Sequence, residues 1–559
     1  MEKILRIFNK EYGNLSQAAI LLGSFTFLSQ ILGLFRDRSI AHFIGPSAIL
    51  DTYYVAFRIP DLIFISFASL ISVTVIIPFI VRRMSGEEIT PSAQKFLSDI
   101  FSSFLLLLTL VSILAFVFMP KLATLVAPGF DSFHQEKVIL LSRIMLLSPI
   151  FLGLSNLFGS ITQIFQRFFV YSLSPILYNL GIILGVVFLY PMWGIEGVAI
   201  GVVLGSFLHC FIQLIFVLHS GFKPKFYFRV HFQSVKEVVL VSLPRTLGLS
   251  LNNIALTLIV VLASYLKSGS ISIFNLSLNL HSVPLGIFGI SYAVAVFPIL
   301  SKFYSANNVE KFKENIISAS RQIIFWSIPA TFLFIVLRAQ IVRVVLGSSS
   351  FSWDNTRLIA ATLAVFSLAI LAEGMIALFS RVYYAKGETK RPLWINLFSA
   401  SLIVICANVF LKIFEQYPFF RDFTESLLKV VDVPGTEVLM LPLAFAVGSI
   451  INFLLYLHFI KRDFLSGEDF VAKTFFQSLG ASFFMALGSY GALNFLSGVF
   501  GTTTFWGIFG QGLIAGIFGI MIWIFVLFVL KSPELADLAK TLKQKFWKTK
   551  VIAPFQEDL

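Results

Sequence analysis

About fourteen long apolar segments follow one another along this chain, with short polar stretches between most of them. A helix that crosses a bilayer needs about 20 predominantly apolar residues, because the hydrocarbon core is about 30 Å thick. The segments are continuous apolar runs rather than alternating apolar and polar residues, which disfavours a membrane β-barrel. We therefore predict an all-α polytopic membrane protein.

The composition agrees with this class. Mean hydropathy is +0.89, and charged residues make up only 13%, against about 25% in ordinary soluble domains. In such a chain the net charge of +13 indicates the positive-inside bias rather than nucleic-acid binding. Cys210 and Cys406 lie inside apolar segments and are interpreted as small core residues, so neither a disulfide nor a metal site is expected. No cofactor is expected.

The predicted helices lie near residues 15–44, 50–82, 95–119, 136–167, 170–191, 194–219, 234–265, 269–304, 310–346, 355–385, 390–414, 436–461, 471–498 and 504–531. With the N-terminus inside, roughly two dozen Lys and Arg residues fall in inner loops and about eight outside. Both termini are then cytoplasmic. The first 14 residues form a poor signal peptide and are expected to stay in place as a surface helix.

A weak internal repeat divides the chain. An Arg after an apolar helix and a Pro-x-x-x-Asn opening the next occur twice, as Arg167 with Pro175/Asn179 and as Arg381 with Pro392/Asn396. The copies are six predicted helices apart, so they share one orientation and predict two parallel lobes with a site between them. We expect an N-lobe at 1–225, a C-lobe at 226–463, two extra helices at 464–531 and a basic cytoplasmic tail at 532–559 that lies on anionic lipid.

Charge gathers in the hairpin from Ser29 to Asp61. A charge at bilayer depth costs several kcal/mol, so such residues normally face a protein interior or a wet cavity. Arginine also suits an anionic phosphate, because its guanidinium stays charged and pairs with phosphate oxygens in a fork. The hairpin is therefore the first place to expect function, and its charged residues are Arg36, Asp37, Arg38, Asp51, Arg58 and Asp61.

The same hairpin resembles the start of the MurJ (MviN) family of lipid II flippases. The family pattern is S-R-x-L-G-x-x-R-D followed by G-x-x-x-x-x-D-x-x-x-x-A-F-R-x-P-[ND], and it is matched by Ser29, Leu32, Gly33, Arg36, Asp37, Asp51, Ala56, Phe57, Arg58, Pro60 and Asp61. Residues 174–205, 284–302 and 381–392 are similar to further family segments in the same order. The resemblance implies the fold of the MOP exporter superfamily, two six-helix lobes around a central cavity, with the last two helices forming a groove for the lipid tail.

Four residues are candidates for substrate contact: Arg36, Arg58, Arg245 and Asn279. Arg36 is the first of these, against a structural pairing with Asp37 or Asp51. Arg58 contacts either the cavity or Asp61. Arg245 opens the second lobe, unless it snorkels to the inner surface. Asn279, with the other asparagines of the seventh and eighth helices, is interpreted as a site residue or as interhelical glue.

Four more residues are candidates for gating or ion coupling: Asp51, Asp61, Arg381 and Glu388. Asp51 caps the second helix or takes part in gating. Asp61 is expected to pair with Arg58 rather than to carry protons. Arg381 and Glu388 sit at an inner loop, where a gate or loop clamp is favoured over substrate contact. His281, the only histidine of the eighth predicted helix, is expected to be a core group.

The sequence departs from the family pattern where charge is usual. Gln30 replaces an Arg, and Phe64 and Ile65 replace an Arg-Arg pair. Ser69, Leu70 and Ile71 stand in place of Glu-Gly-Ala. Ser277, Leu278 and Asn279 stand in place of Ala-Asp-Arg. These losses fit a divergent branch with fewer arginines, a different substrate, or loss of transport.

We predict a bacterial inner-membrane flippase, not an enzyme, that moves an undecaprenyl-pyrophosphate-linked glycan, lipid II, by alternating access. No G-x-x-x-x-G-K-[ST] motif is present, so energy would come from membrane potential, an ion gradient such as that of a monovalent ion, or downhill flux. The alternatives are another MOP-type exporter of lipid-linked oligosaccharides or of drugs by cation antiport, a non-transporting scaffold for cell-wall synthesis proteins, and a membrane glycosyltransferase. The last would need an acidic motif on a sizeable outer loop, and the longest, near 415–435, has no paired motif.

Overall fold

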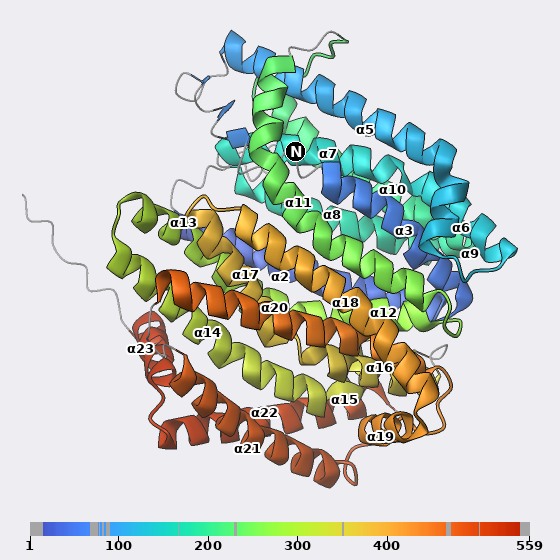
Figure 1. Cartoon of the computed structure of the whole chain (residues 1–559), viewed down its shortest axis with the longest axis vertical. Coiled ribbons are helices and arrows are strands. Elements are labelled where there is room, and N and C mark those ends of the chain that lie inside the picture. The colour runs from blue at the N-terminus through green and yellow to red at the C-terminus, as the bar shows by residue number, and fades with distance from the viewer. Residues whose placement is uncertain are drawn as a thin grey trace, which may run out of the picture. The chain divides into compact units, whose positions relative to one another are not determined.

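The computed structural model describes residues 15–67, 76–77, 79–80, 83–84, 90–165, 167–228, 232–348, 352–465, 471–501 and 504–547. All regular secondary structure in these ranges is helical (Figure 1). The helices of the N-terminal half are α2 (Leu15–Phe43), α3 (Ala48–Phe67), α5 (Pro91–Val126), α6 (Ser132–Met145), α7 (Leu147–Ile164), α8 (Phe168–Leu184), η2 (Gly185–Leu189), α9 (Tyr190–Trp193), α10 (Ile195–His219), α11 (Phe232–Ala263) and α12 (Ser270–Pro284). They are followed by η3 (Leu285–Ile290), α13 (Ser291–Ser305), α14 (Val309–Val336), α15 (Arg338–Val345), α16 (Trp353–Ser367), α17 (Ile370–Ala385), α18 (Lys390–Gln416), α19 (Pro418–Leu428), η4 (Thr436–Leu439), α20 (Met440–Phe464), α21 (Ala472–Leu496), α22 (Phe505–Val529) and α23 (Pro533–Trp547).

The described helices confirm an all-α membrane protein. Eleven stretches are long and apolar enough to cross a membrane, and a twelfth is the pair α16 and α17, which is bent by 43°. The predicted count of fourteen also requires α2 and α3 to cross, and both carry several charges. That count therefore stays a prediction.

Some predicted helices are broken. Residues 136–167 divide into α6 and α7 at Leu146, three residues before Pro149, which has no N–H for the helical ladder. Residues 170–191 include the π-helical turn η2, and residues 269–304 include η3 directly after Pro284. The predicted helix over 50–82 runs beyond Phe67 into residues outside the described ranges.

The chain separates into two compact units. Unit 1 comprises residues 1–283, 345–366 and 388–452. Unit 2 comprises residues 284–344, 367–387 and 453–559. The two units are defined by contacts within the chain, whereas the predicted lobes are defined by the sequence repeat. The division into lobes therefore stays a prediction.

Unit 1 has closely packed helices. A Cβ added at Gly181 of α8 would lie 2.3 Å from the backbone of Gly205 in α10, so the two helices meet through their main chains. In α3, Ser47 caps the helix by accepting from the N–H of Leu50. The prediction that Asp51 caps this helix is therefore wrong, because Asp51 already lies inside the first turn of α3.

Unit 2 is held by an apolar core between α14, α21 and α22. Phe325, Ala481, Met485, Trp523 and Leu527 are its buried residues. The rings of Phe325 and Trp523 lie 4.9 Å apart. The start of α23 is tied to this unit because Glu534, which is buried, accepts hydrogen bonds from Thr474 at 2.6 Å and from Ser532 at 2.8 Å. The lipid contact of the basic tail stays a prediction.

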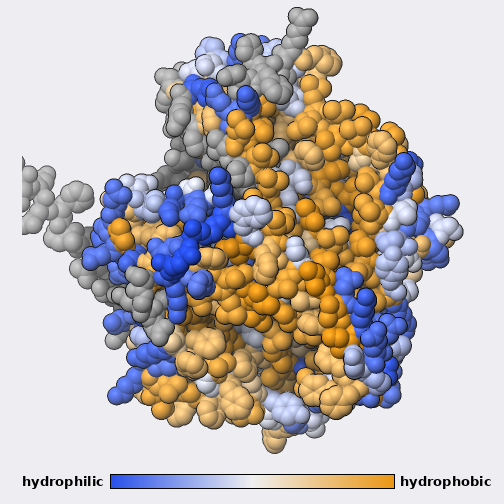
Figure 2. Space-filling view, in the orientation of Figure 1, coloured by the Kyte–Doolittle hydropathy of each residue, from blue (hydrophilic) through white to orange (hydrophobic). Residues whose placement is uncertain are grey.

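Much of the outer surface is apolar. Figure 2 shows hydrophobic residues over a large part of the visible face, with hydrophilic residues gathered toward its margins. Many large apolar side chains are more than half exposed, among them Phe118, Phe398 and Phe525. Contiguous exposed apolar surface of this extent is what a helix bundle presents to lipid.

Candidate functional site

A cavity lies inside unit 1, between α2, α3, α7, α8 and α12. Its volume is about 390 Å³. Its charged lining residues are Arg36, Asp37, Arg58 and Asp61, and its polar ones include Tyr53, Tyr54, Tyr178, Asn275 and Asn279. Four of the six charged residues of the hairpin therefore line one cavity.

Arg36 is held by groups on two helices. Its Nε and Nη2 donate to Oδ1 of Asp37 at 3.0 and 2.8 Å, and its Nη1 donates to Oδ1 of Asn179 in α8 at 3.1 Å. Asp37 is buried, and its other oxygen accepts from Asn279 of α12 at 3.1 Å. The pairing of Arg36 with Asp37 and the contact of Arg36 with the cavity, which the sequence offered as alternatives, are both present. Two of the five guanidinium N–H groups remain for a ligand.

Arg58 lies on the neighbouring helix and faces the same cavity. Its Nη2 donates to Oδ1 of Asn275 in α12 at 2.6 Å. Its Nε is buried and has no acceptor among the described residues, and the hydroxyl of Tyr54 is in the same condition. A buried donor without an acceptor costs about 1–3 kcal/mol, so these two groups are suited to an anionic oxygen in the cavity.

The expected pairing of Arg58 with Asp61 is replaced by the bond to Asn275. Asp61 lies one turn further along α3 and lines the cavity, where it contributes negative charge near Arg58. Tyr54, Arg58 and Asp61 are spaced i, i+4 and i+7, which places them on one face of the helix. Tyr54 is not among the candidates predicted from the sequence, although its spacing from Arg58 places it on the same helix face.

Asp51 lies in the first turn of α3, before Arg58, and binds the start of α12. Its carboxylate accepts from the N–H of Gly269 at 2.6 Å, from the N–H of Ser272 at 2.7 Å and from the hydroxyl of Ser272 at 2.5 Å. The side chain is only 3% exposed. A carboxylate at a helix N-terminus satisfies free N–H groups and interacts favourably with the helix dipole. Asp51 therefore caps a helix, but the helix is α12.

The remaining candidates lie elsewhere. Arg245 is in α11, and its side chain is outside the described residues. Arg381 donates to the carbonyl of Ala377 in its own helix at 2.7 Å. Glu388 forms an ion pair with Arg391 at 3.2 Å. His281 is buried and stacks on Phe366, with ring centroids 5.6 Å apart, in the position of a core group.

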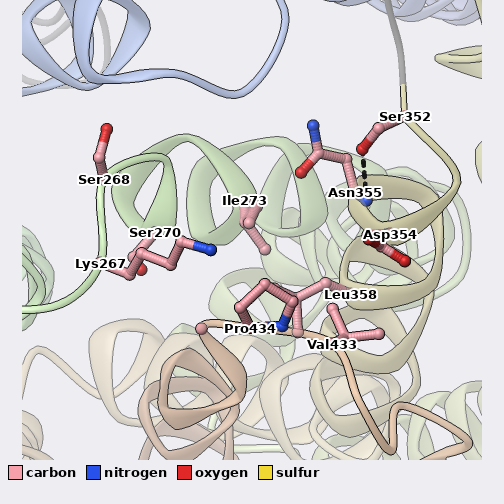
Figure 3. A pocket seen from close by; sticks show the side chains of 11 residues that line it. Lys267, Ser268, Ser270, Ile273, Ser352, Asp354, Asn355, Leu358, Val433 and Pro434 are labelled. Atoms are coloured by element: carbon pink, nitrogen blue, oxygen red, sulfur yellow. Dashed lines mark hydrogen bonds between the residues drawn. The ribbon is translucent and has the colours of Figure 1, made fainter.

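A second cavity of about 200 Å³ lies in unit 1, around the turn before α12 (Figure 3). Lys267, Ser270 and Asp354 line it, and Asn355 donates its N–H to the hydroxyl of Ser352 at its edge. In Figure 3 the Lys267 ammonium and the Asp354 carboxylate approach it from different elements. Lys267 is the one cation among its described lining residues, and its volume is smaller, so it is a poorer site for a large anionic head group than the first cavity.

The comparisons with known proteins decide the family. The family model of the lipid II flippase MurJ matches residues 40–509, which is most of the chain. This chain belongs to the MurJ family. A probable lipid II flippase MurJ of Rickettsia prowazekii is 28% identical over 407 residues, covering 72% of this chain and 79% of that protein. That of Haemophilus influenzae is 28% identical over 391 residues, covering 66% and 76%.

The solved structures agree with the family. A lipid II flippase MurJ in an inward closed conformation superposes with a TM-score of 0.71 at 25% identity, covering 93% of this chain and all of that one. A multidrug-resistance MATE transporter of the MOP superfamily, at 16% identity and a TM-score of 0.62, shares the fold and covers 80% of this chain. The all-α fold of this chain is therefore that of these transporters, while the two six-helix lobes stay a prediction.

Some of the positions at which the sequence departs from the MurJ family pattern line the first cavity. Phe64, Leu278 and Asn279, which stand where the resemblance implies charged residues, all line the cavity that holds Arg36 and Arg58. Three of the departures therefore lie in the candidate site itself, whereas Gln30 and Ile65 do not line the cavity and Ser69, Leu70 and Ile71 lie outside the described residues. Asn279 keeps a polar contact there through its bond to Asp37.

Proposed function

We propose that this chain moves lipid II across the bacterial inner membrane by alternating access. The observation that carries the proposal is the pair of guanidinium groups, Arg36 and Arg58, that line one internal cavity in a chain of the MurJ family. Positive charge inside an apolar bundle is expensive without nearby negative charge. Asp37 and Asp61 supply some of it, and both guanidinium groups keep N–H donors that a further anion can use. The pyrophosphate of lipid II is such an anion.

The donors available in the cavity suit pyrophosphate oxygens. Arg36 has N–H groups beyond those used by Asp37 and Asn179, and Arg58 offers its buried Nε. Tyr54 adds a hydroxyl in the same chamber. In a site of low dielectric these charge-assisted hydrogen bonds are stronger than they would be in water. The sugars of the head group would face the asparagine amides of α12.

Asp51 supports a gate at the outer end of the cavity. The helices it joins, α3 and α12, belong to the predicted N-lobe and C-lobe respectively, and both lie in unit 1. Opening toward the outside would require Asp51 to leave the N-terminus of α12, which exposes two N–H groups and a carboxylate to water. We infer that this bond holds the outer side closed, while Arg381 and Glu388 act at the inner side.

The orientation of the termini, the energy source and the partners are proposed from the sequence. Both termini lie in the cytoplasm on the positive-inside rule. The energy source is membrane potential, a monovalent ion gradient or downhill flux, with Asp61 as the candidate for ion coupling. Cell-wall synthesis proteins are the expected partners.

The test is rescue of cells depleted of their own lipid II flippase. Arg36→Ala and Arg58→Ala should each abolish rescue at wild-type protein levels, because each removes a phosphate-binding charge from the cavity. Arg38→Ala is the matched control: it removes the same charge two residues further along α2, at a position that does not line the cavity. Rescue by Arg36→Ala would contradict the proposed site.

A second measurement separates the substrate from its rivals. The purified chain in liposomes should move lipid II and should not move a lipid-linked O-antigen oligosaccharide. Failure of wild type to rescue, together with transport of the oligosaccharide, would favour another exporter of the superfamily. Binding of cell-wall synthesis proteins without any transport would favour the scaffold.

A further inference from the structure

The outer stretch near 415–435, expected as a loop, contains the helix α19. It begins two residues after α18 ends and closes at Lys429, which adopts a left-handed conformation with φ of 61°. Three large apolar side chains on it are exposed by 57–86%: Phe419, Phe423 and Leu427. They are spaced i, i+4 and i+8, so they form one stripe, the α19 stripe.

The rest of α19 divides into a docked face and a wet face. Phe420, next to the stripe, is half-buried, and its ring lies 6.5 Å from that of the buried Phe414. Arg421 and Asp422 lie on the other side, where both are exposed and 3.7 Å apart. The apolar arc of α19 is therefore wider than the part that the rest of the protein covers. The charged side chains of Arg421 and Asp422 lie outside this arc.

Two contacts hold α19 at a fixed place in unit 1. Arg357 of α16 donates three hydrogen bonds, at 2.9–3.1 Å, to the carbonyls of Lys429 and Val431 at the end of α19. Thr436 donates to the carboxylate of Glu425 at 2.6 Å. The α19 stripe is therefore exposed on a helix that is anchored, not on a free loop.

The preceding span shows the depth at which α19 lies. The exposed apolar stripe of α18 consists of Trp394, Phe398, Ile405 and Val409. It runs into Lys412 and Gln416, which are exposed and polar, so α18 leaves the hydrocarbon there. Since α19 starts at Pro418, it lies at the level where α18 leaves the hydrocarbon.

We propose that α19 is an interfacial helix that inserts the α19 stripe into the leaflet at the C-terminal end of α18, which is the outer leaflet in the predicted orientation. A helix with a wide apolar arc and charges opposite lies in the interface with its apolar face in the boundary between head groups and acyl chains. Residues 415–432 carry four acidic residues, at 415, 422, 425 and 432, and two basic ones, Arg421 and Lys429. Its lipid partner is therefore zwitterionic, since the segment has no net attraction for anionic lipid.

This anchor is adjacent to the gate. The chain after α19 contributes Val433, Pro434 and Gly435 to the second cavity, whose other wall includes the turn before α12 (Figure 3). That turn holds Gly269, one of the groups that bind Asp51. Lipid contact at α19 would thereby steady the outer end of α12.

The test is site-directed spin labelling of the full chain in zwitterionic phosphatidylcholine liposomes. Cys210 and Cys406 are first replaced by Ala, and labels are placed singly at positions 419, 423 and 427, with the exposed positions 421 and 422 as matched controls outside the stripe. Labels at 419, 423 and 427 should collide with dissolved oxygen and be shielded from aqueous nickel–EDDA. Labels at 421 and 422 should show the opposite preference.

Three outcomes overturn the proposal. Ready access of nickel–EDDA to 419, 423 and 427 would mean that the α19 stripe faces water. Exclusion of both reagents, with dipolar broadening between labels, would mean that a second copy of the chain covers it. A clear increase in insertion on adding anionic phosphatidylglycerol would contradict the charge argument, because the segment should respond weakly or in the opposite direction. The label at position 419 should show the same oxygen and nickel–EDDA accessibility in the Arg36→Ala variant. The test of α19 is then independent of transport.

Discussion

Asn179 in α8 and Asn396 in α18 occupy the same place in two copies of one sequence pattern, and they have different roles. Asn179 accepts from the Arg36 guanidinium at 3.1 Å and donates to the carbonyl of Pro175 at 3.1 Å. Asn396 accepts from the neutral amide of Asn452 at 3.4 Å. The repeat therefore reproduces a local amide, while the helix packed opposite decides which side chain that amide contacts.

The two helices also differ in how they meet their neighbours. α8 meets α10 through the main chains of Gly181 and Gly205. In α18, Ile403 fills the space left by Gly448 of α20, where an added Cβ would lie 2.1 Å from a side-chain carbon. Close main-chain contact makes α8 a fixed support, whereas a side chain in α18 can adjust.

The largest expected effect concerns Asn179. Asn179→Leu should lower the rate of lipid II transport by about tenfold or more, because losing a hydrogen bond to a charged group costs about 1.5–3 kcal/mol and leaves Arg36 misoriented. Transport in proteoliposomes measures it. In a double-mutant cycle with Arg36→Lys, the effects of the two substitutions on the transport rate should be non-additive. Additive effects would mean that Asn179 does not act through Arg36.

The next effect concerns helix packing. Gly181→Ala should destabilise the protein by about 1–3 kcal/mol, because the backbone of Gly205 cannot move aside. Gly448→Ala should cost less, since Ile403 can change rotamer. Apparent melting temperatures in detergent give the comparison. Adding Ile403→Ala should restore the melting temperature of the Gly448→Ala variant, because it removes the side chain that the added methyl group meets. No second substitution can do this for Gly181, because the group opposite it is the backbone of Gly205. Equal losses in the two single variants would remove this contrast.

A smaller effect is expected at the second amide. Asn396→Leu breaks a bond between neutral side chains, and such interhelical bonds contribute about 0.6 kcal/mol on average in membranes. Transport should stay within about twofold of wild type, as measured in the proteoliposome assay used for Asn179→Leu. A loss as large as that of Asn179→Leu would mean that the two repeat copies carry equivalent sites.

The smallest effect is expected at Asn452. Its Oδ1 is buried without a donor among the described residues. Asn452→Leu removes that unsatisfied group, so the melting temperature should stay the same or rise slightly, in line with the near-neutral effect of replacing buried polar groups by apolar ones. A marked fall would show that the amide has a structural partner of its own.

The sequence by itself determined the class, the position of the charged hairpin and the family. Length and continuity of apolar runs are local properties, and lipid imposes helices on any chain that has them. Arg36, Arg58 and Asn279 could be chosen because charge and amides are rare in such segments. Their shared cavity follows from the same cost, since a bundle must turn these groups inward.

Only the tertiary structure decided the partners. Asp51 caps α12 rather than its own helix, Arg58 bonds Asn275 rather than Asp61, and Asn179 meets the guanidinium of Arg36. Each of these contacts joins residues more than a hundred positions apart, and sequence spacing constrains only neighbours within one helix. Whether a polar group is satisfied depends on the atoms brought opposite to it, and those are chosen by helix packing.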